Sequence, residues 1–336
     1  MIRYPNLKQG ATIGVTAPSS GVPTELHELL KMSCSRMEEK GFHIICGETA
    51  WTQDKAKSAP AKQRAEEFNN MMLDDRIDLI IPPWGGELLI ETLEYIDFEN
   101  IQTKWLLGYS DISLLLLAIT LKTGLATAHG TNLVDLRGEY SDDTTAMWFS
   151  VLSTTAGTPI LQTSSSKYQK EWQFDKPTPY VFHLTEQTLW KSISTNVMIE
   201  GRLLGGCIDV IRHLIGTPFG DVQNFTKNYI NGEPILWYFE NCELSTTDIR
   251  RTLVQMKLAG WFDHCSGIMF GRSPANTSVN NYTIDDVYQE LYEELCIPII
   301  FDIDCGHVPP QLTLINGAFA KVELENGKGI VTQHFK

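Results

Sequence analysis

The stretch from Lys104 to Leu121 reads KWLLGYSDISLLLLAITL, and it decides the fold of the N-terminal half of the chain. Its first six residues predict an apolar strand, and the apolar run that starts at Ile112 predicts a strongly apolar helix. Only a short turn around Ser110 separates the strand from the helix. A strand that runs directly into a helix is typical of α/β folds, in which functional residues lie at the carboxyl ends of the strands.

The same alternation of strand and helix precedes this stretch. Strands separated by helices of this length favour a parallel sheet. We therefore predict an α/β domain with a parallel sheet in residues 1–153. Its further strands are expected at residues 11–17, 42–46 and 77–81, and its helices at residues 24–40, 59–73 and 87–95.

A second domain is predicted after a change of composition. A chain of 336 residues is longer than one hydrophobic core usually serves. Residues 154–195 are rich in polar and turn-forming residues, so we expect them to form a connector with a functional insertion. Residues 196–336 predict a C-terminal domain, with strands at 235–239, 267–271, 299–303, 318–324 and 329–332 and helices at 207–214, 248–259 and 284–296.

The charge balance argues against several classes of partner. The chain has 27 Lys and Arg against 41 Asp and Glu, a formal net charge of −14, which repels nucleic-acid backbones and anionic lipid surfaces. Its longest apolar run, residues 112–121, is about half a membrane span, and residues 1–8 lack the apolar core of a secretory signal. Seven scattered cysteines without a C-x-x-C pair predict reduced thiols. We expect a cytoplasmic protein that binds neither nucleic acid nor membranes.

Neither a metal site nor a cofactor site is predicted. The sequence has no H-E-x-x-H motif and no paired cysteine ligands, and its eight histidines are widely spaced. It has no P-loop, and Gly10 and Gly14 lie at the start of a strand rather than after one, unlike the glycines of a dinucleotide site. We therefore expect chemistry that is carried by side chains and the backbone alone.

Ser110 lies where the strand at residues 104–109 meets the helix. This is the setting of a nucleophile elbow, in which a sharp turn lifts a serine oxygen above the sheet and the N–H groups of the helix face developing negative charge. The usual glycine two residues later is replaced by Ile112. Alternatively, Ser110 only caps the helix, a role that stabilises a helix by about 1 kcal/mol. The local pattern leaves both roles open.

Two other strand ends offer the partners that a catalytic serine needs, a base and an acidic group that orients the base. Glu240 follows the apolar residues 235–239, and His307 follows the strand at 299–303 in a loop with two prolines. The chain order serine, glutamate, histidine matches a known order of triad residues. Each residue alone is also explained as an exposed strand end or a packing residue, but the three together favour a triad.

A set of short motifs in a fixed order extends this pattern over nearly the whole chain. The motifs are Gly108-Tyr109-Ser110-Asp111, Phe239-Glu240-Asn241 and Gly306-His307-Val308-Pro309, with Pro83-Trp84-Gly85-Gly86, Gly201-Arg202-Leu203-Leu204-Gly205-Gly206, Gly216-Thr217-Pro218 and Leu314-Ile315-Asn316-Gly317. This set resembles the family of serine peptidases that holds the LD-carboxypeptidases and the microcin C self-immunity proteins. Asn241 and Asn316 differ from the commoner residues of that family.

The resemblance implies a fold and a mechanism. The fold would combine a flavodoxin-like N-terminal domain, with a parallel sheet, and a swivelling β/α C-terminal domain. Ser110 would attack an amide carbonyl, His307 would transfer the proton, and Glu240 would orient His307. The backbone N–H groups of Asp111 and Gly86 would form the oxyanion hole. Family members are commonly dimers, which makes a homodimer an option, although the sequence shows no interface.

The resemblance also implies two substrates of different kinds. The immunity branch cleaves the amide that joins aspartate to a modified adenylate, and the murein branch releases terminal D-alanine from a tetrapeptide. The length of the insertion favours the immunity branch, because its aromatic rings can stack on a base for about 1–3 kcal/mol each; packing between domains is their alternative role. The expected substrate-binding residues are Gly85, Trp172, Phe174 and Trp190.

The alternative hypothesis, from another functional class, is a non-catalytic protein that binds a nucleotide or a muropeptide in the same cleft. Loss of a triad residue would mark such a protein, and the sequence retains Ser110, Glu240 and His307. The enzyme is therefore the favoured reading.

Overall fold

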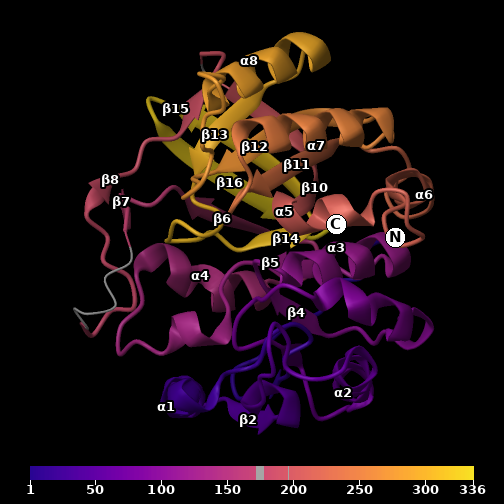
Figure 1. Ribbon diagram of the computed structural model, residues 1–336, viewed down its shortest axis with the longest axis vertical. Coiled ribbons are helices and arrows are strands. Elements are labelled where there is room, and N and C mark those ends of the chain that lie inside the picture. The colour runs from indigo at the N-terminus through magenta and orange to yellow at the C-terminus, as the bar shows by residue number, and fades with distance from the viewer. Residues whose placement is uncertain (172–177, 196) are drawn as a thin grey trace.

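The computed structural model describes residues 1–171, 178–195 and 197–336. The N-terminal half, indigo to magenta, lies below the orange and yellow C-terminal half in Figure 1, and each half has its own large sheet. Helix α3 and strands β5 and β14 lie where the two halves meet (Figure 1). The chain therefore has the predicted two-part α/β architecture.

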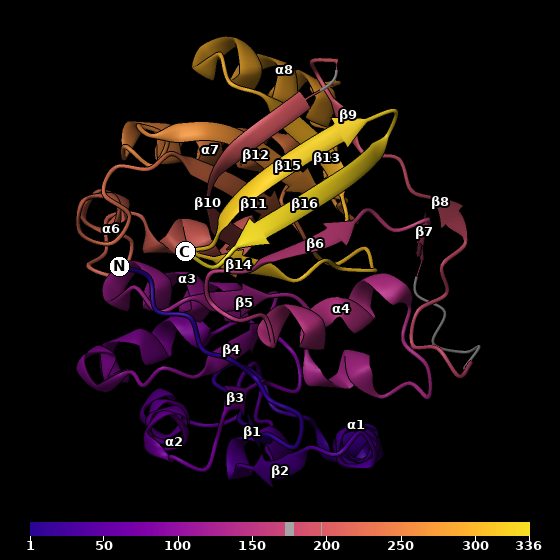
Figure 2. The ribbon, with the colours of Figure 1, turned by 180° about the vertical axis from the view of Figure 1, so that it is seen from behind.

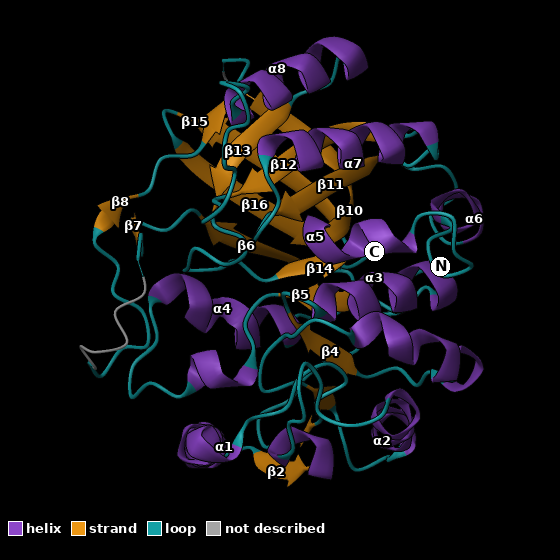
Figure 3. Ribbon diagram, in the orientation of Figure 1, coloured by secondary structure: helices purple, strands orange, loops and turns teal. Residues whose placement is uncertain are grey.

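The N-terminal sheet has the strand order of a flavodoxin-like fold. Its strands run β2-β1-β3-β4-β5, all parallel, and β14 adds an antiparallel edge beside β5. Helices lie on both faces, with α1 and α2 on opposite sides of the sheet in Figure 3. The elements are β1 (Thr12–Val15), α1 (His27–Glu39), β2 (His43–Cys46), α2 (Ala61–Leu73), β3 (Leu79–Ile80), β4 (Trp105–Gly108), α3 (Ile112–Thr123), β5 (Thr127–His129), α4 (Asp143–Leu152) and β14 (Leu314–Asn316).

The C-terminal sheet is mixed. Its order is β6-β16-β15-β10-β11-β12-β13-β9, and the central strands β10 to β13 are parallel. Helices α7 and α8 cover one face, whereas β15, β16 and β6 lie in front when the molecule is seen from behind (Figures 1 and 2). The elements are β6 (Pro159–Thr163), β9 (Lys191–Ser192), β10 (Val197–Cys207), α5 (Ile208–Ile211), α6 (Val222–Asn228), β11 (Ile235–Glu240), α7 (Thr246–Leu258), β12 (Cys265–Gly271), α8 (Ile284–Leu295), β13 (Ile299–Ile303), β15 (Phe319–Glu325) and β16 (Lys328–His334).

Shorter elements complete the fold. The predicted helix at residues 87–95 is a 3-10 helix, Leu89–Tyr95, which packs against α2. Strands β7 (Lys167–Tyr168) and β8 (Glu186–Gln187) form a separate antiparallel pair. Other 3-10 turns lie at Thr24–Leu26, Glu48–Trp51, Phe98–Asn100, Leu133–Leu136 and Arg212–Leu214. None of the described helices is long and apolar enough to span a bilayer.

The packing of helix α3 explains why its sequence is apolar on every side. Ten of its residues, from Ile112 to Leu121, are buried, because the helix packs on the N-terminal sheet and also contacts β10, α5 and α6 of the C-terminal half. A close approach at Gly206 permits this contact: a Cβ atom there would lie 2.6 Å from the Cβ of Ser113. The helix that follows Ser110 is thus fixed by both halves of the chain.

Strand pairing crosses the predicted domain bounds in both directions. Strands β6 and β9, from the segment predicted as a connector (154–195), pair with the two edges of the C-terminal sheet. Strand β14, from the predicted C-terminal domain, pairs with β5 of the N-terminal sheet. The division at residues 153 and 196 stays a prediction, and these pairings tie the parts together across it.

Candidate active site

Ser110 occupies a strained turn between β4 and α3. Its φ is +65°, a left-handed conformation that a non-glycine residue adopts at an energetic cost. The cap position of α3 belongs to Asp111, which makes no side-chain capping bond, and the Ser110 hydroxyl instead lies 3.1 Å from Nε2 of His307. The interpretation of Ser110 as a helix cap is therefore wrong, and the turn has the form of a nucleophile elbow.

His307 and Glu240 complete a chain of hydrogen bonds that starts at Ser110. The second ring nitrogen of His307, Nδ1, lies 2.8 Å from Oε2 of Glu240. Glu240 is the last residue of β11 and is 1% exposed, whereas His307 lies in the loop after β13. Three strand ends from two halves of the chain thus bring together the residues predicted from the sequence.

The electrostatics of the pair favour a charged His307. Burial acts to raise the pKa of Glu240, but the charge of His307 and its hydrogen bond outweigh burial, so this pKa lies below its ordinary value. Burial acts to lower the pKa of His307, but the charge and hydrogen bond of Glu240, together with a contribution from Cys242, outweigh burial, so the pKa of His307 lies well above its ordinary value. Both shifts stabilise the ion pair that forms when a serine gives its proton to the histidine.

The loop of Gly85 and Gly86 lies directly against Ser110. A Cβ atom at Gly85 would lie 2.6 Å from Oγ of Ser110 and 3.2 Å from the backbone nitrogen of Asp111. Gly86 has a φ of +148°, which favours glycine. Within the described ranges, no acceptor takes a hydrogen bond from the N–H of Asp111 or of Gly86. Both groups are thus available to an oxyanion.

The side chain of Asp111 fastens this loop to the rest of the site. It is 2% exposed and accepts hydrogen bonds from Oγ of Ser19 (2.5 Å) and from the backbone N–H of Leu89 (2.9 Å). Burial raises the pKa of Asp111. The buried guanidinium of Arg64 also donates to the carbonyls of Pro18 and Leu88. The positions of both glycines are therefore set by hydrogen bonds around them.

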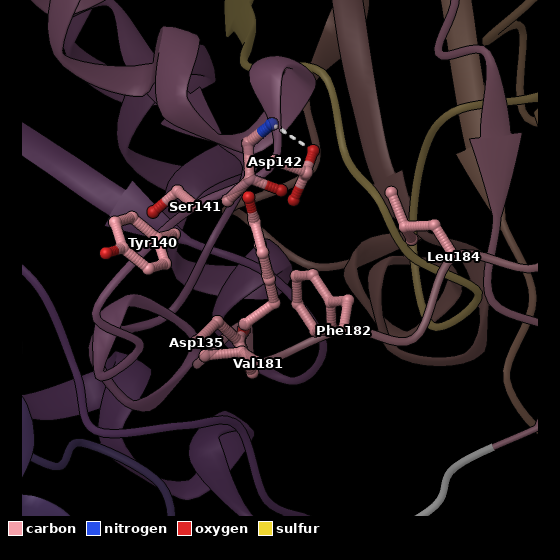
Figure 4. Close-up of a pocket in the computed structure, with 9 residues that line it drawn as sticks. Asp135, Tyr140, Ser141, Asp142, Val181, Phe182 and Leu184 are labelled. Carbon is pink, nitrogen blue, oxygen red and sulfur yellow. Dashed lines mark hydrogen bonds between the residues drawn. The ribbon is translucent and has the colours of Figure 1, made fainter. Parts of the chain in front are cut away.

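A cleft of about 320 Å³ gives access to the Ser110 hydroxyl. The ring of Tyr109, which lines this cleft, lies 5.1 Å from that of His307, measured between ring centroids. A second pocket of about 240 Å³ is lined by Asp135, by residues 140–142 and 145, and by residues 180–182 and 184. Figure 4 shows Asp135 beside Val181 and Phe182 in this second pocket, with Leu184 set apart from Tyr140 and Ser141. The cleft is lined by Ser20, Trp84, Gly85, Gly86, Tyr109, Ser110, Asn132 and His307.

Several residues around the site were not predicted from the sequence. Asn132 accepts a hydrogen bond from the backbone N–H of Tyr109 (3.3 Å) and lines the cleft. His129, at the end of β5, is completely buried, and burial lowers its pKa to about 4, so it is neutral beneath the site at neutral pH. His129 ends β5, the strand beside β4, and Asn132 follows it; this strand-end position is the sequence signal that could have indicated both residues.

The predicted aromatic binding residues have different outcomes. Trp172 and Phe174 lie outside the described residues. Trp190 is 2% exposed and packs in the core of the C-terminal sheet, where its Nε1 donates to Oδ2 of Asp304 (2.9 Å). Asp304 also pairs with Arg272 at 2.7 Å and lies three residues before His307. The structure therefore gives Trp190 a packing position that supports the His307 loop, and we propose no substrate contact for it.

Trp190→Phe is expected to lower stability rather than substrate affinity. The change removes a hydrogen bond to a buried carboxylate and leaves a gap in the core, which together lower the free energy of unfolding by about 2–4 kcal/mol. Urea denaturation measures this loss, and steady-state kinetics should show a KM within about twofold of wild type. Trp84→Phe is the matched control, because Trp84 lines the cleft. A severalfold rise in KM for Trp190→Phe at unchanged stability would contradict the packing role.

The side chains of Asn316 and Asn241 both hydrogen-bond to neighbouring segments and hold them in place. Oδ1 of Asn316 accepts hydrogen bonds from the backbone N–H of Gly205 and the hydroxyl of Tyr238, each at 2.9 Å. The side chain of Asn241 bonds to both backbone groups of Leu244 and so closes the turn between β11 and α7. Neither asparagine lines the cleft.

In the described part of the chain, one group of side chains has the composition of a metal site. It comprises Cys207, Glu240 and His307, whose ligand atoms lie within 4.8 Å of one another. Two of its three members already pair with each other through a hydrogen bond. The prediction of catalysis without a metal stays a prediction.

Comparisons with known proteins agree with this architecture. The family model of the LD-carboxypeptidase N-terminal domain matches residues 13–130, and that of the LD-carboxypeptidase C-terminal domain matches residues 200–322. The microcin C7 self-immunity protein MccF of Escherichia coli is 26% identical over 344 residues, with 98% of this chain and 95% of that protein covered. The probable murein peptide carboxypeptidase of Bacillus subtilis is 25% identical over 335 residues, with 97% and 92% covered.

A solved structure has the same fold. MccF in complex with aspartyl sulfamoyl adenosine superposes with a TM-score of 0.84 at 22% identity, and the match covers 100% of this chain and 99% of that one. Both halves of the chain thus match one family in sequence, and the fold matches over the full length. The chain belongs to the LD-carboxypeptidase family of serine peptidases and is a hydrolase.

Proposed function

We propose that this protein is a carboxypeptidase-type amidase that uses Ser110, His307 and Glu240 as its catalytic triad. The observation that carries the proposal is the chain of hydrogen bonds from the strained Ser110 through both nitrogens of His307 to the buried Glu240. Each residue comes from a different strand end, and the serine opens onto a cleft. This arrangement supplies a nucleophile, a base and an orienting acid.

The proposed reaction has two halves. Oγ of Ser110 attacks the amide carbonyl while Nε2 of His307 takes its proton, and Glu240 stabilises the imidazolium through Nδ1. The N–H groups of Asp111 and Gly86 bind the oxyanion of the tetrahedral intermediate. His307 then protonates the leaving nitrogen, so the amide bond breaks and an acyl-enzyme remains. Water activated by His307 hydrolyses the acyl-enzyme and restores the serine.

For the substrate we propose the amide of a toxic aminoacyl-nucleotide, of the processed microcin C type. One relative is named as a microcin self-immunity protein, and its structure has been solved with aspartyl sulfamoyl adenosine. The long insertion carries Trp172 and Phe174, which we propose to stack on the base. Gly85 is proposed to let the scissile carbonyl approach Ser110 closely.

The second candidate is release of terminal D-alanine from a murein tetrapeptide. A second relative, whose sequence identity to this chain is almost the same as that of the immunity protein, is named as a probable murein peptide carboxypeptidase. Both candidates place an amide carbonyl at Ser110 and differ only in the groups on either side of it. They therefore share one mechanism and differ in specificity.

Mass spectrometry of reaction products separates the two candidates. The purified protein is offered an aspartyl-adenylate mimic joined through an amide nitrogen, and separately an LD-linked murein tetrapeptide. We expect cleavage of the aspartyl amide, with kcat/KM at least about tenfold above that for the tetrapeptide, a difference of about 1.4 kcal/mol in transition-state binding. The Ser110→Ala protein is the control for background hydrolysis.

Two outcomes would change the conclusion. Release of D-alanine alone would replace the immunity function by murein recycling, with the triad retained. Absence of cleavage of both substrates, together with tight binding of either one, would favour the non-catalytic binding protein instead.

A further inference from the structure

A buried thiol lies next to the acid–base pair of the proposed triad. Cys207 is the last residue of β10, where it is the register partner of Glu240 in the parallel ladder with β11. Cys207 is 2% exposed, and its Sγ belongs to the group whose ligand atoms all lie within 4.8 Å of one another. The proposed mechanism makes no use of this thiol.

Glu240 has a second oxygen that the triad leaves free. Oε2 accepts the hydrogen bond from His307, but no N–H or O–H group of the described residues donates to Oε1, which is buried. A second carboxylate also lies close, because Sγ of Cys207 is 3.3 Å from Oδ2 of Asp209. An imidazole, a thiol and a carboxylate therefore lie together beside Ser110, and a second carboxylate contacts the thiol.

This donor set matches the preferences of one class of ion. Zn²⁺ is bound by cysteine sulfur, histidine nitrogen and carboxylate oxygen, and Cd²⁺ shares its affinity for thiolates. Metal–ligand distances of about 2.0–2.3 Å place the donor atoms of a tetrahedral site roughly 3–4 Å apart. Side-chain shifts of about 1 Å would bring the present atoms to that spacing.

We propose that Cys207, Glu240 and His307 form an inhibitory site for a thiophilic divalent cation, with Zn²⁺ as the type ion. The ion would bond to Sγ of Cys207, to a carboxylate oxygen of Glu240 and to Nδ1 of His307, and water would complete the coordination shell. It acts as an inhibitor and not as a cofactor, since it would replace the hydrogen bond on which the triad depends.

Inhibition follows from the position of one proton. The thiol of Cys207 releases its proton to solvent when the Sγ–metal bond forms. Charged His307 also releases a proton to solvent, and because the metal occupies Nδ1, the one proton that the neutral ring keeps lies on Nε2. Nε2 then donates toward Oγ of Ser110, 3.1 Å away, and cannot accept the serine proton. The inhibitory effect rests on the proposed triad, but binding of the ion does not.

Binding is tested first, without substrate. Cd²⁺ is titrated into the full-length reduced protein, and the ultraviolet charge-transfer band of the cadmium–thiolate bond is recorded. Cys207→Ser keeps the size of the side chain and removes the thiolate. We expect Cys207→Ser to lose the absorbance that corresponds to one equivalent of bound Cd²⁺ per protein. Ser110→Ala should retain this absorbance. Cys305→Ser is the matched control, because the Cys305 thiol is buried near Glu240 but lies outside the ligand group, and this variant should retain that equivalent.

Inhibition is tested next with Zn²⁺, and each variant is compared with its own metal-free rate. The Zn²⁺ concentration for half-inhibition should rise at least about tenfold in Cys207→Ser and stay within about twofold in Cys305→Ser, since a lost ligand costs 10- to 100-fold or more in affinity. A full cadmium band in Cys207→Ser, or equal inhibition of wild type and Cys207→Ser, would overturn the proposal. If the protein shows no hydrolysis at all, the cadmium result still decides on the site, so failure of the proposed function is distinguished from failure of this inference.

Discussion

Ser110→Ala is expected to lower kcat for amide hydrolysis by roughly 10⁴- to 10⁶-fold, because the nucleophile is lost and only the oxyanion hole and substrate binding remain. The substitution removes a single oxygen atom, which hydrogen-bonds to Nε2 of His307. The melting temperature should therefore stay within about 3 °C of wild type. Steady-state kinetics and differential scanning calorimetry measure the two quantities.

Ser113→Ala is the matched control for this change. Ser113 lies one helical turn further along α3, and its buried hydroxyl has no hydrogen-bond partner among the described residues. Its removal should leave kcat within about twofold of wild type, since surface and packing changes without lost partners have small effects. Turnover retained by Ser110→Ala, or lost equally in Ser113→Ala, would refute the assignment of the nucleophile.

Glu240→Gln should have the second largest effect, a fall in kcat of about 10³- to 10⁴-fold. The amide occupies the same volume but carries no charge, so it neither stabilises the imidazolium of His307 nor holds the ring in the correct tautomer. Glu243→Gln is the control, because Glu243 is an exposed residue of the following loop. A fall of less than about tenfold in Glu240→Gln would show that Glu240 does not orient the base.

The same variant changes the pH dependence. His307 acts as a base only when neutral, and Glu240 holds its pKa well above the ordinary value, against the lowering effect of burial. In wild type, kcat/KM should therefore rise with pH through a midpoint above the ordinary histidine value of about 6.5. In Glu240→Gln, burial acts without the carboxylate, so the midpoint should move to lower pH. A midpoint that does not move would contradict the coupling of the two groups.

Much of the fold could be predicted because its signals are local. The alternation of apolar strands and amphipathic helices indicated the parallel N-terminal sheet, and the apolar run after Ser110 indicated a strongly apolar helix, which the structure shows to be buried from Ile112 to Leu121. The pairing of β14 with β5 could not be predicted in this way. Strand β14 has three residues, and its partner lies nearly two hundred positions away along the chain, so no local periodicity marks it.

Prediction of the active site from the sequence has the same limit. Strand-end positions identified the three residues that the structure brings together, because parallel sheets gather their carboxyl ends. Trp190 has an aromatic ring in a polar segment, and from the sequence it was predicted to bind substrate. Its partner Asp304 lies 114 positions away, and only the folded chain shows that this hydrogen bond supports the His307 loop. Long-range partners of single side chains carry no sequence pattern.

Covalent labelling with a fluorophosphonate probe tests the central claim most directly, because the probe reacts with a serine that an adjacent base has activated. We expect a single adduct, which peptide mass spectrometry places on Ser110. Labelling should persist in Ser113→Ala, slow strongly in His307→Ala and be absent in Ser110→Ala. An unlabelled wild-type protein, or an adduct that forms on another residue at the same rate in Ser110→Ala, would contradict this claim.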